Sequence, residues 1–116
     1  MSHFLHCYLE THRRRWGLSQ EELASLLGQR SSSAVSRCET LQRIPNLRVA
    51  LQLELIFGVT PQDLFPALYR EAEDAVMRQA KALHETLEGR TDAKSQEKLA
   101  LLSLIIERAK GDIDYV

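Results

Sequence analysis

The sequence predicts an all-α protein made of a five-helix N-terminal domain and a two-helix C-terminal arm. Its 116 residues include only five glycines and three prolines, and they contain no run of β-branched side chains, so the composition favours helix over sheet. Apolar residues recur at intervals of three and four, which is the spacing of one helix face. Capping residues and glycines mark where successive helices begin and end. We place the domain boundary at Pro66, which gives residues 1–66 and 67–116.

The first predicted helix runs from about residue 3 to residue 16. Its apolar face is formed by Leu5, Leu9, His12 and Trp16. These residues follow one another at helical spacing, and Gly17 ends the helix because glycine readily takes the left-handed conformation of a C′ residue. An arginine run, residues 13–15, lies in the last turn, where it complements the negative end of the helix dipole. Contact with phosphate groups is the alternative role for this run.

The second predicted helix begins with a capping box at Ser19 and Glu22. In this arrangement the serine hydroxyl accepts a hydrogen bond from the third helical amide, and the glutamate reaches back to the serine amide. Gly28 ends the helix after roughly two turns, because glycine allows the chain to turn with positive φ. The apolar face of this helix consists of Leu23, Leu26 and Leu27.

A serine-rich stretch follows and predicts a third helix from about residue 31 to residue 40. Serine suits helix caps and turns better than helix interiors. Val35 and Cys38 are expected to be buried, with Ala34 at the edge. The outward residues are expected to be Ser32, Ser33, Ser36 and Arg37. A polar, short-chained outer face beside a flexible basic residue is an unusual surface for a helix with only a structural role.

The fourth and fifth predicted helices complete the N-terminal domain. Asn46 caps a helix that runs to residue 57 and ends at Gly58, and its many apolar residues predict that it is largely buried. These residues are Leu47, Ala50, Leu51, Leu53, Leu55 and Ile56. Thr60 followed by Pro61 opens a short fifth helix that carries Leu64 and Phe65.

Beyond Pro66 the sequence predicts two helices separated by a break at residues 89–91. Thr91 or Asp92 caps the second of them, which ends at Gly111 before a loose tail. The first helix carries an apolar stripe of Leu68, Ala72, Val76, Ala80, Leu83 and Leu87.

Four residues of the last helix are too apolar to be left in water: Leu101, Leu102, Ile105 and Ile106. We predict that they form the interface of a two-fold homodimer. The alternative is that the last two helices fold as a hairpin onto the domain of their own chain.

Charge and cysteine usage narrow the class of protein. The formal net charge is −1, which does not by itself indicate a nucleic-acid partner, although residues 1–66 carry seven arginines against six acids and phosphate contact is a local effect. No run of 18 apolar residues and no signal-peptide pattern occurs, so we expect a soluble cytoplasmic protein with no membrane partner. Cys7 and Cys38 lack metal-ligand spacing and are interpreted as core residues, with a redox pair as the alternative.

Several separated segments together resemble one known domain. Four parts of the chain occur in the order and spacing of a family pattern. They are the segment 17–28, the residues Ser36-Arg37-Cys38-Glu39, the pair Pro45 and Leu47, and the segment 58–65. The pattern resembles the DNA-binding domain of phage repressors, Cro proteins and bacterial XRE-type regulators, over residues 5–66. The resemblance implies a five-helix lambda-repressor-like fold whose second and third helices form a helix-turn-helix, with the second helix of this pair in the major groove of double-stranded DNA.

The resemblance also implies roles for individual residues. Gln20 is expected to contact a phosphate at a helix N-terminus, and Arg43 in the following loop to anchor another. Glu39 is expected to be structural and to hold an arginine of the first helix, while Arg37 has pairing with an acid as an alternative role. The expected base and nearby phosphate contacts are Arg30, Ser31, Ser32, Ser33, Ser36 and Arg37.

The chain departs from the family pattern at three places. One residue more than usual lies between Gly28 and Ser36, which alters the turn or the start of the recognition helix. Leu41 stands where the family often has glycine, and His12 where leucine is common. A buried neutral histidine and a pH-responsive one are both compatible with His12.

These features together predict a transcriptional regulator of the repressor type that binds a palindromic operator as a homodimer. No catalytic motif, metal site or cofactor site occurs at meaningful spacing, so we expect neither an enzyme nor a cofactor. A protein effector, if one exists, would bind the arm. The alternative is a helix-turn-helix module for protein partners, antitoxin-like or anti-regulator. Positive charge gathered on the face of the third helix would favour DNA, and scattered arginines would favour a protein partner.

Overall fold

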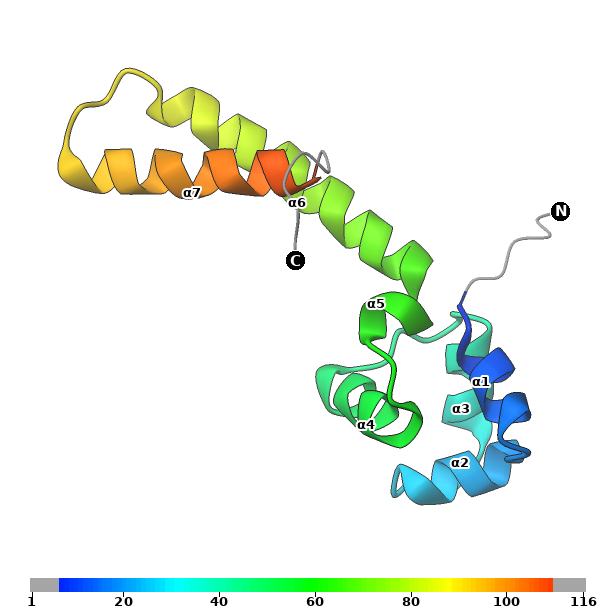
Figure 1. The fold of residues 1–116 in the computed structure, drawn as a ribbon. Helices are drawn as coiled ribbons and strands as arrows, with labels where there is room; N and C mark the ends of the chain where they lie inside the picture. The colour runs from blue at the N-terminus through cyan, green and yellow to red at the C-terminus, as the bar shows by residue number, and fades with distance from the viewer. Residues whose placement is uncertain (1–6, 110–116) are drawn as a thin grey trace, which may run out of the picture. The chain divides into compact units, whose positions relative to one another are not determined.

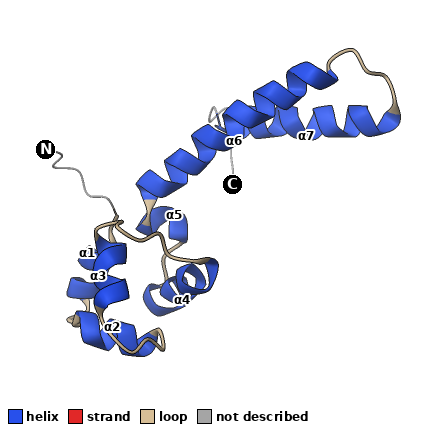
Figure 2. Cartoon of the chain, turned by 180° about the vertical axis from the view of Figure 1, so that it is seen from behind, coloured by secondary structure: helices blue, strands red, loops and turns tan. Residues whose placement is uncertain are grey.

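The computed structural model describes residues 7–109, and within them every regular element is a helix (Figures 1 and 2). The chain divides into two compact units, residues 1–69 and 70–116, which we describe separately. The predicted all-α fold is confirmed. The helices are α1 Leu9–Arg15, α2 Gln20–Leu26, α3 Ser33–Glu39, α4 Leu47–Phe57, α5 Pro61–Leu64, α6 Pro66–Leu87 and α7 Ala93–Ala109.

The core of the first unit takes one fully buried side chain from each of its five helices. These are Leu9, Leu23, Val35, Leu53 and Leu64. Burying an aliphatic side chain of this size contributes about 1.5–3 kcal/mol, so each helix gains at least this much from packing against the others. The short helices α1, α2 and α3, with seven residues each, depend on this packing because isolated helices of that length are marginal in water.

The capping predictions for this unit are confirmed. The Ser19 hydroxyl accepts a hydrogen bond from the Glu22 amide at 3.0 Å, and the Ser19 amide donates to the Glu22 carboxylate at 2.9 Å. The Asn46 side chain accepts from the Val49 amide at 2.9 Å, which starts α4. Gly28 has the positive φ, 75°, that the turn after α2 requires.

The predicted apolar face of the first helix is partly wrong. Leu5 lies outside the described residues, and Trp16 is 67% exposed. Since α1 ends at Arg15 and the chain turns at Gly17 with φ 73°, Trp16 is no longer on a helix face directed at the core. Arg13 occupies the buried position instead, and His12 is half-buried with its ring 6.0 Å from that of Phe57.

The prediction that α4 is largely buried is also wrong, as is the inward placement of Leu26. On α4 only the side that carries Leu53, with Val49 and Ile56 packed beside it, meets the core. Three of the leucines assigned to the interior are exposed: Leu47, Leu51 and Leu55. A helix that is apolar on all sides has no polar face to mark its solvent side, so the sequence pattern placed too many residues inside.

The second unit is a helical hairpin in which α6 and α7 lie side by side (Figure 1). Ala80 and Leu87 of α6 are buried against Leu102 of α7, with Leu99, Ile105 and Ile106 packed against them. Asp92 caps α7 by accepting a hydrogen bond from the Ser95 amide at 3.0 Å. Hydrogen bonds from Ser95 hold the pKa of Asp92 below its usual value. The predicted end of this helix and the tail beyond it lie outside the described residues.

The hairpin changes how the four residues assigned to a dimer interface are used. Leu102, Ile105 and Ile106 pack within the hairpin of their own chain, and Leu101 is exposed. The predicted stripe on α6 divides in the same way, because Ala80 and Leu87 face inward while Val76 and Leu83 remain accessible. No described helix has the length and apolar character needed to cross a bilayer.

Candidate nucleic-acid interface

The outer face of α3 is polar, as its sequence predicted. Val35, Cys38 and Glu39 are buried, whereas Ser33, Ser36 and Arg37 are exposed. The buried residues recur at the spacing of one helix face, so the exposed ones lie on the opposite side. Arg37 has no acidic partner among the described residues, so its guanidinium is available for an external ligand.

The third helix starts later in the chain than the sequence predicted. The helix begins at Ser33, two positions later than Ser31, where we placed its earliest start. The Ser31 hydroxyl accepts a hydrogen bond from the Ser33 amide at 3.3 Å and lies 3.0 Å from the Ser33 hydroxyl. Ser32 is half-buried, and its hydroxyl donates to the Glu21 carboxylate at 3.5 Å. Ser31 and Ser32 therefore stabilise the turn and lie outside the helix, while Arg30 before them is exposed.

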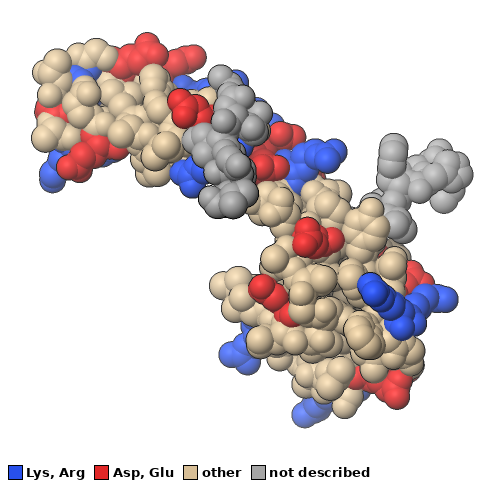
Figure 3. Space-filling model, viewed as in Figure 1, with Lys and Arg blue, Asp and Glu red and all other residues tan. Residues whose placement is uncertain are grey.

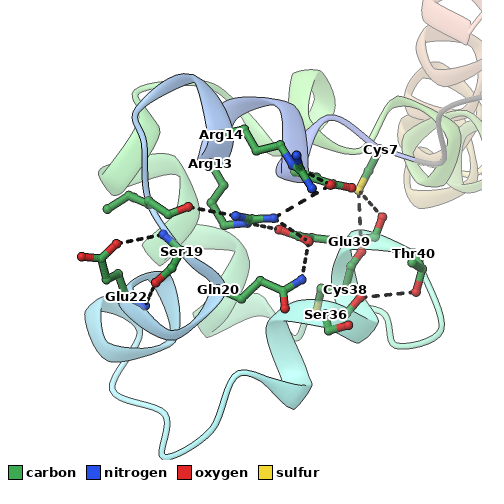
Figure 4. Close-up of polar contacts among 12 residues, drawn as sticks. Cys7, Arg13, Arg14, Ser19, Gln20, Glu22, Ser36, Cys38, Glu39 and Thr40 are labelled. Carbon is green, nitrogen blue, oxygen red and sulfur yellow. Dashed lines mark hydrogen bonds and ion pairs between the residues drawn. The ribbon is translucent and has the colours of Figure 1, made fainter.

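A buried ion pair joins α1 to the end of α3 (Figure 4). The Arg13 guanidinium donates to both oxygens of Glu39, from Nε at 2.5 Å and from Nη2 at 3.3 Å. The two residues are only 7% and 8% exposed. The Arg13 Nη1 also donates to the Leu18 carbonyl at 2.8 Å, and the hydrogen bond with Glu39 is the main reason that the pKa of Arg13 is raised. The structural role predicted for Glu39 is confirmed.

Gln20 takes part in the same network. Its side-chain nitrogen donates to Glu39 Oε1 at 2.9 Å, so the first residue of α2 is tied to the last residue of α3. Sequence reasoning missed this contact, because the residues lie 19 positions apart and nothing in their local pattern links them. One N–H of the Gln20 side-chain amide therefore donates to Glu39. The phosphate contact that we expect from Gln20 stays a prediction, and it would be made by the other N–H.

The arginine run of α1 does not act as one basic patch. Arg13 is buried, which excludes it from phosphate contact. Arg14 is exposed and pairs with Glu10 at 2.7 Å, and Arg15 is exposed. On the face drawn in Figure 3, the Lys and Arg side chains of the first unit lie at separate places. We expected a DNA-binding protein to gather residues 13–15 and the other arginines on one face. The structure shows this arrangement only in part.

The loop after α3 has the shape that glycine would give it. Leu41 has φ 57°, in the left-handed region that a leucine seldom adopts. Its side chain packs against the core, which offsets the strain. The turn brings the amides of Gln42 and Arg43 to the Arg37 carbonyl at 2.8 and 3.2 Å, so the backbone of Arg43 is fixed at the end of α3, and its side chain is exposed.

The two cysteines lie close to the end of α3 as well. Cys7 Sγ contacts the carbonyl oxygens of Cys38 and Glu39 at 3.6 and 3.5 Å, and both thiols are buried. Burial is the main cause that raises the pKa of each cysteine. Because the thiolate is the reactive form, this environment supports their interpretation as core residues.

Comparison with known proteins assigns the first unit. A family model described as helix-turn-helix matches residues 11–64, a range that begins within α1 and ends with α5. No curated protein and no solved structure matches the chain.

Replacing Glu39 by leucine is expected to lower the free energy of unfolding by about 3 kcal/mol, because it leaves the Arg13 guanidinium buried without its counter-charge. Urea denaturation followed by circular dichroism measures the loss. The matched control is the double variant Arg13→Met with Glu39→Leu, which should recover part of the stability since no charge stays buried. A double variant less stable than Glu39→Leu alone would contradict this account.

Proposed function

Since residues 11–64 form a helix-turn-helix domain of the XRE and phage-repressor family, and the chain is thus a DNA-binding regulator in the general sense, we propose that it is a repressor that binds a palindromic operator as a homodimer. In this proposal α3 lies in the major groove. Two copies related by a two-fold axis would place their α3 helices one DNA turn apart, which matches the symmetry of a palindrome.

The exposed face of α3 is the single observation that carries the proposal. Ser33 and Ser36 have short side chains that permit a close approach to base edges, and serine can hydrogen-bond to several bases. Arg37 can grip a guanine with two hydrogen bonds. We therefore assign most of the sequence readout of α3 to Arg37, and propose that Ser33 and Ser36 allow this approach.

The surrounding loops supply the remaining proposed contacts. Arg30, with Ser31 and Ser32, belongs to the turn that leads into α3, and we assign Arg30 to a base or a nearby phosphate. Arg43, held by its backbone beside the last turn of α3, is assigned to a phosphate, as is Gln20 at the start of α2. Phosphate contacts of this kind fix the register of a protein on DNA without reading its sequence.

The hairpin supports a dimer through a different set of residues from those first assigned. Val76 and Leu83 of α6 and Leu101 and Leu104 of α7 are about half exposed. Val76 and Leu83 each precede a buried α6 residue by four positions, and Leu101 precedes the buried Leu102 by one. Viewed along each helix from its N-terminus, the exposed residues are therefore rotated in the same direction away from the buried residues that contact the other helix. In an antiparallel pair such residues lie on the same side, so we define Val76, Leu83 and Leu101 as the outer face of the hairpin. Leu104, two positions after Leu102, lies on the side of α7 away from α6.

Two hairpins that join through their outer faces would form a four-helix bundle. One hairpin alone has a small core, in which only Ala80, Leu87 and Leu102 are buried hydrophobic residues among those described. Burial of these three apolar side chains would add stabilisation of about 25 cal/mol per Å² of apolar area. This supports the homodimer, and a protein effector that bound the same face would compete with it.

The alternative function is a helix-turn-helix module for protein partners. It is favoured by the pairing of Arg13 with Glu39 and of Arg14 with Glu10, which leaves less positive charge for DNA.

Selection of bound sequences from random duplex DNA with the purified protein tests the proposal directly. We expect enrichment of a palindrome whose half-sites lie about one helical turn apart. Failure to enrich any sequence at low salt would remove DNA binding and leave the protein-partner alternative.

Replacing Arg37 by alanine is expected to weaken binding to the selected duplex by about tenfold or more, because a bidentate base contact contributes about 1–3 kcal/mol. Arg30→Ala is also expected to weaken binding, through the loss of a base or phosphate contact. Fluorescence anisotropy of labelled duplex measures the change at fixed salt. Arg90→Ala, an exposed arginine of the second unit, is the matched control and should leave affinity unchanged. If the Arg30→Ala, Arg37→Ala and Arg90→Ala proteins all bind the duplex as tightly as the unaltered protein, α3 is not the face that reads the bases.

Replacing Leu101 by glutamate is expected to shift the protein from dimer to monomer in sedimentation velocity, since a charge would be buried in the outer face. Lys81→Glu, on α6 one position after buried Ala80 and therefore on the other side of the hairpin, is the control. Ile105 and Ile106 are less suitable because they pack inside the hairpin. A Leu101→Glu protein that stays dimeric at the lowest concentration measured would exclude this interface.

A further inference from the structure

One acidic side chain lies beside the start of α3, the helix to which the proposed function assigns the reading of DNA. Glu21, the second residue of α2, is exposed, and its carboxylate accepts a hydrogen bond from the Ser32 hydroxyl at 3.5 Å. Ser32 directly precedes α3, and its hydroxyl does not cap that helix. The contact therefore places a carboxylate of α2 next to the turn from which α3 begins.

The contacts of Glu21 leave one of its oxygens unused. Within residues 7–109 no basic side chain forms an ion pair with Glu21. Its Oε2 atom accepts from Ser32, whereas no described residue donates to Oε1. The hydrogen bond with Ser32 restricts the direction of the carboxylate, so the free oxygen is partly oriented before a ligand arrives.

The neighbouring Glu22 has a different role. Its carboxylate accepts from the Ser19 amide at 2.9 Å in the capping box (Figure 4), so it stabilises the start of α2. Both glutamates lie in the first turn of α2, where negative charge is favourable. Of the two, it is Glu21 that reaches the turn before α3.

Glu21 lies among residues that we assign to DNA. Gln20 precedes it, and its partner Ser32 lies between Arg30 and Ser33 in the sequence. The N-terminal part of a recognition helix is the part that meets base edges. A carboxylate at this place can only accept hydrogen bonds, and phosphate groups offer it no donor.

The major groove offers a carboxylate two kinds of donor, which are the amino groups of cytosine and adenine. Adenine also presents its N7 acceptor beside the amino group, and this acceptor repels a carboxylate. Guanine presents only acceptors in this groove, and thymine presents an acceptor and a methyl group. Cytosine is therefore the base that best matches an ionised glutamate.

We propose that Glu21 is a specificity-determining residue, whose carboxylate accepts a hydrogen bond from N4 of a cytosine in each half-site. The inference rests on the proposed function, since it requires α3 in the major groove. Arg37 reads a guanine from the exposed face of α3, and Glu21 reads a cytosine near the start of the same helix. The acidic charge thus limits which sequences the arginines of this region can bind.

Selection from random duplex DNA with three forms of the full-length protein tests the proposal. We expect the unaltered protein to select cytosine at one position of each half-site, and Glu21→Ala to accept any base there while its other preferences stay the same. Glu22→Gln is the matched control, because it removes one negative charge from the same turn and glutamine can keep the capping box. It should select the same sequence as the unaltered protein.

Binding to two duplexes measures the size of the contact. Changing the selected C·G pair to T·A should weaken binding by the unaltered protein and by Glu22→Gln by about fivefold or more. The same change should leave the affinity of Glu21→Ala nearly unaltered. Fluorescence anisotropy at fixed salt gives the affinities, and circular dichroism checks that each variant keeps its helix content.

Two results would overturn the inference while the proposed function stands. In one, Glu21→Ala selects the same sequence as the unaltered protein. In the other, Glu21→Ala and Glu22→Gln bind both duplexes more tightly by the same factor, which would mean that Glu21 acts only through its net charge. If the unaltered protein selects no sequence, the proposed function fails and this inference fails with it.

Discussion

The orientation of α3 depends on the buried ion pair between Arg13 and Glu39. Two charges withdrawn from water carry a large desolvation cost, which is offset only when geometry and further hydrogen bonds satisfy both groups. Here Glu39 receives Arg13 through two nitrogens and also the Gln20 amide, and Arg13 has the Leu18 carbonyl as a further acceptor. The pair thus connects α1 and the start of α2 to the last residue of α3, and this fixes which side of α3 faces outward.

The same network determines which charges are available at the surface. Arg13 and part of Gln20 are used inside the domain, although both lie in segments whose sequence indicated phosphate contact. The exposed arginines near α3 are then Arg30, Arg37 and Arg43, and these carry the proposed readout and anchoring. A chain with a net charge of −1 can work in this way because phosphate recognition depends on a few local charges.

Both units of the protein leave an apolar surface unpaired, and for the same physical reason. In the hairpin, two helices can bury only the sides that face each other, so the outer face at Val76, Leu83 and Leu101 remains accessible. In the first unit, α4 meets the core on one side and leaves Leu47, Leu51 and Leu55 exposed on the other. Faces of this kind favour association with further helices, which links the fold to the assembly that we propose.

The sequence by itself determined the order of the helices, the caps of α2, α4 and α5 and the polar side of α3, because helix periodicity and capping are local properties. It also indicated, through the family resemblance, that Glu39 holds an arginine of α1. Only the tertiary structure decided what covers each apolar face. Trp16 and Leu55 are exposed, and Ile105 and Ile106 pack within their own hairpin. Periodicity identifies the apolar side of a helix, but burial depends on which other elements reach that side, and those contacts join residues far apart in the chain.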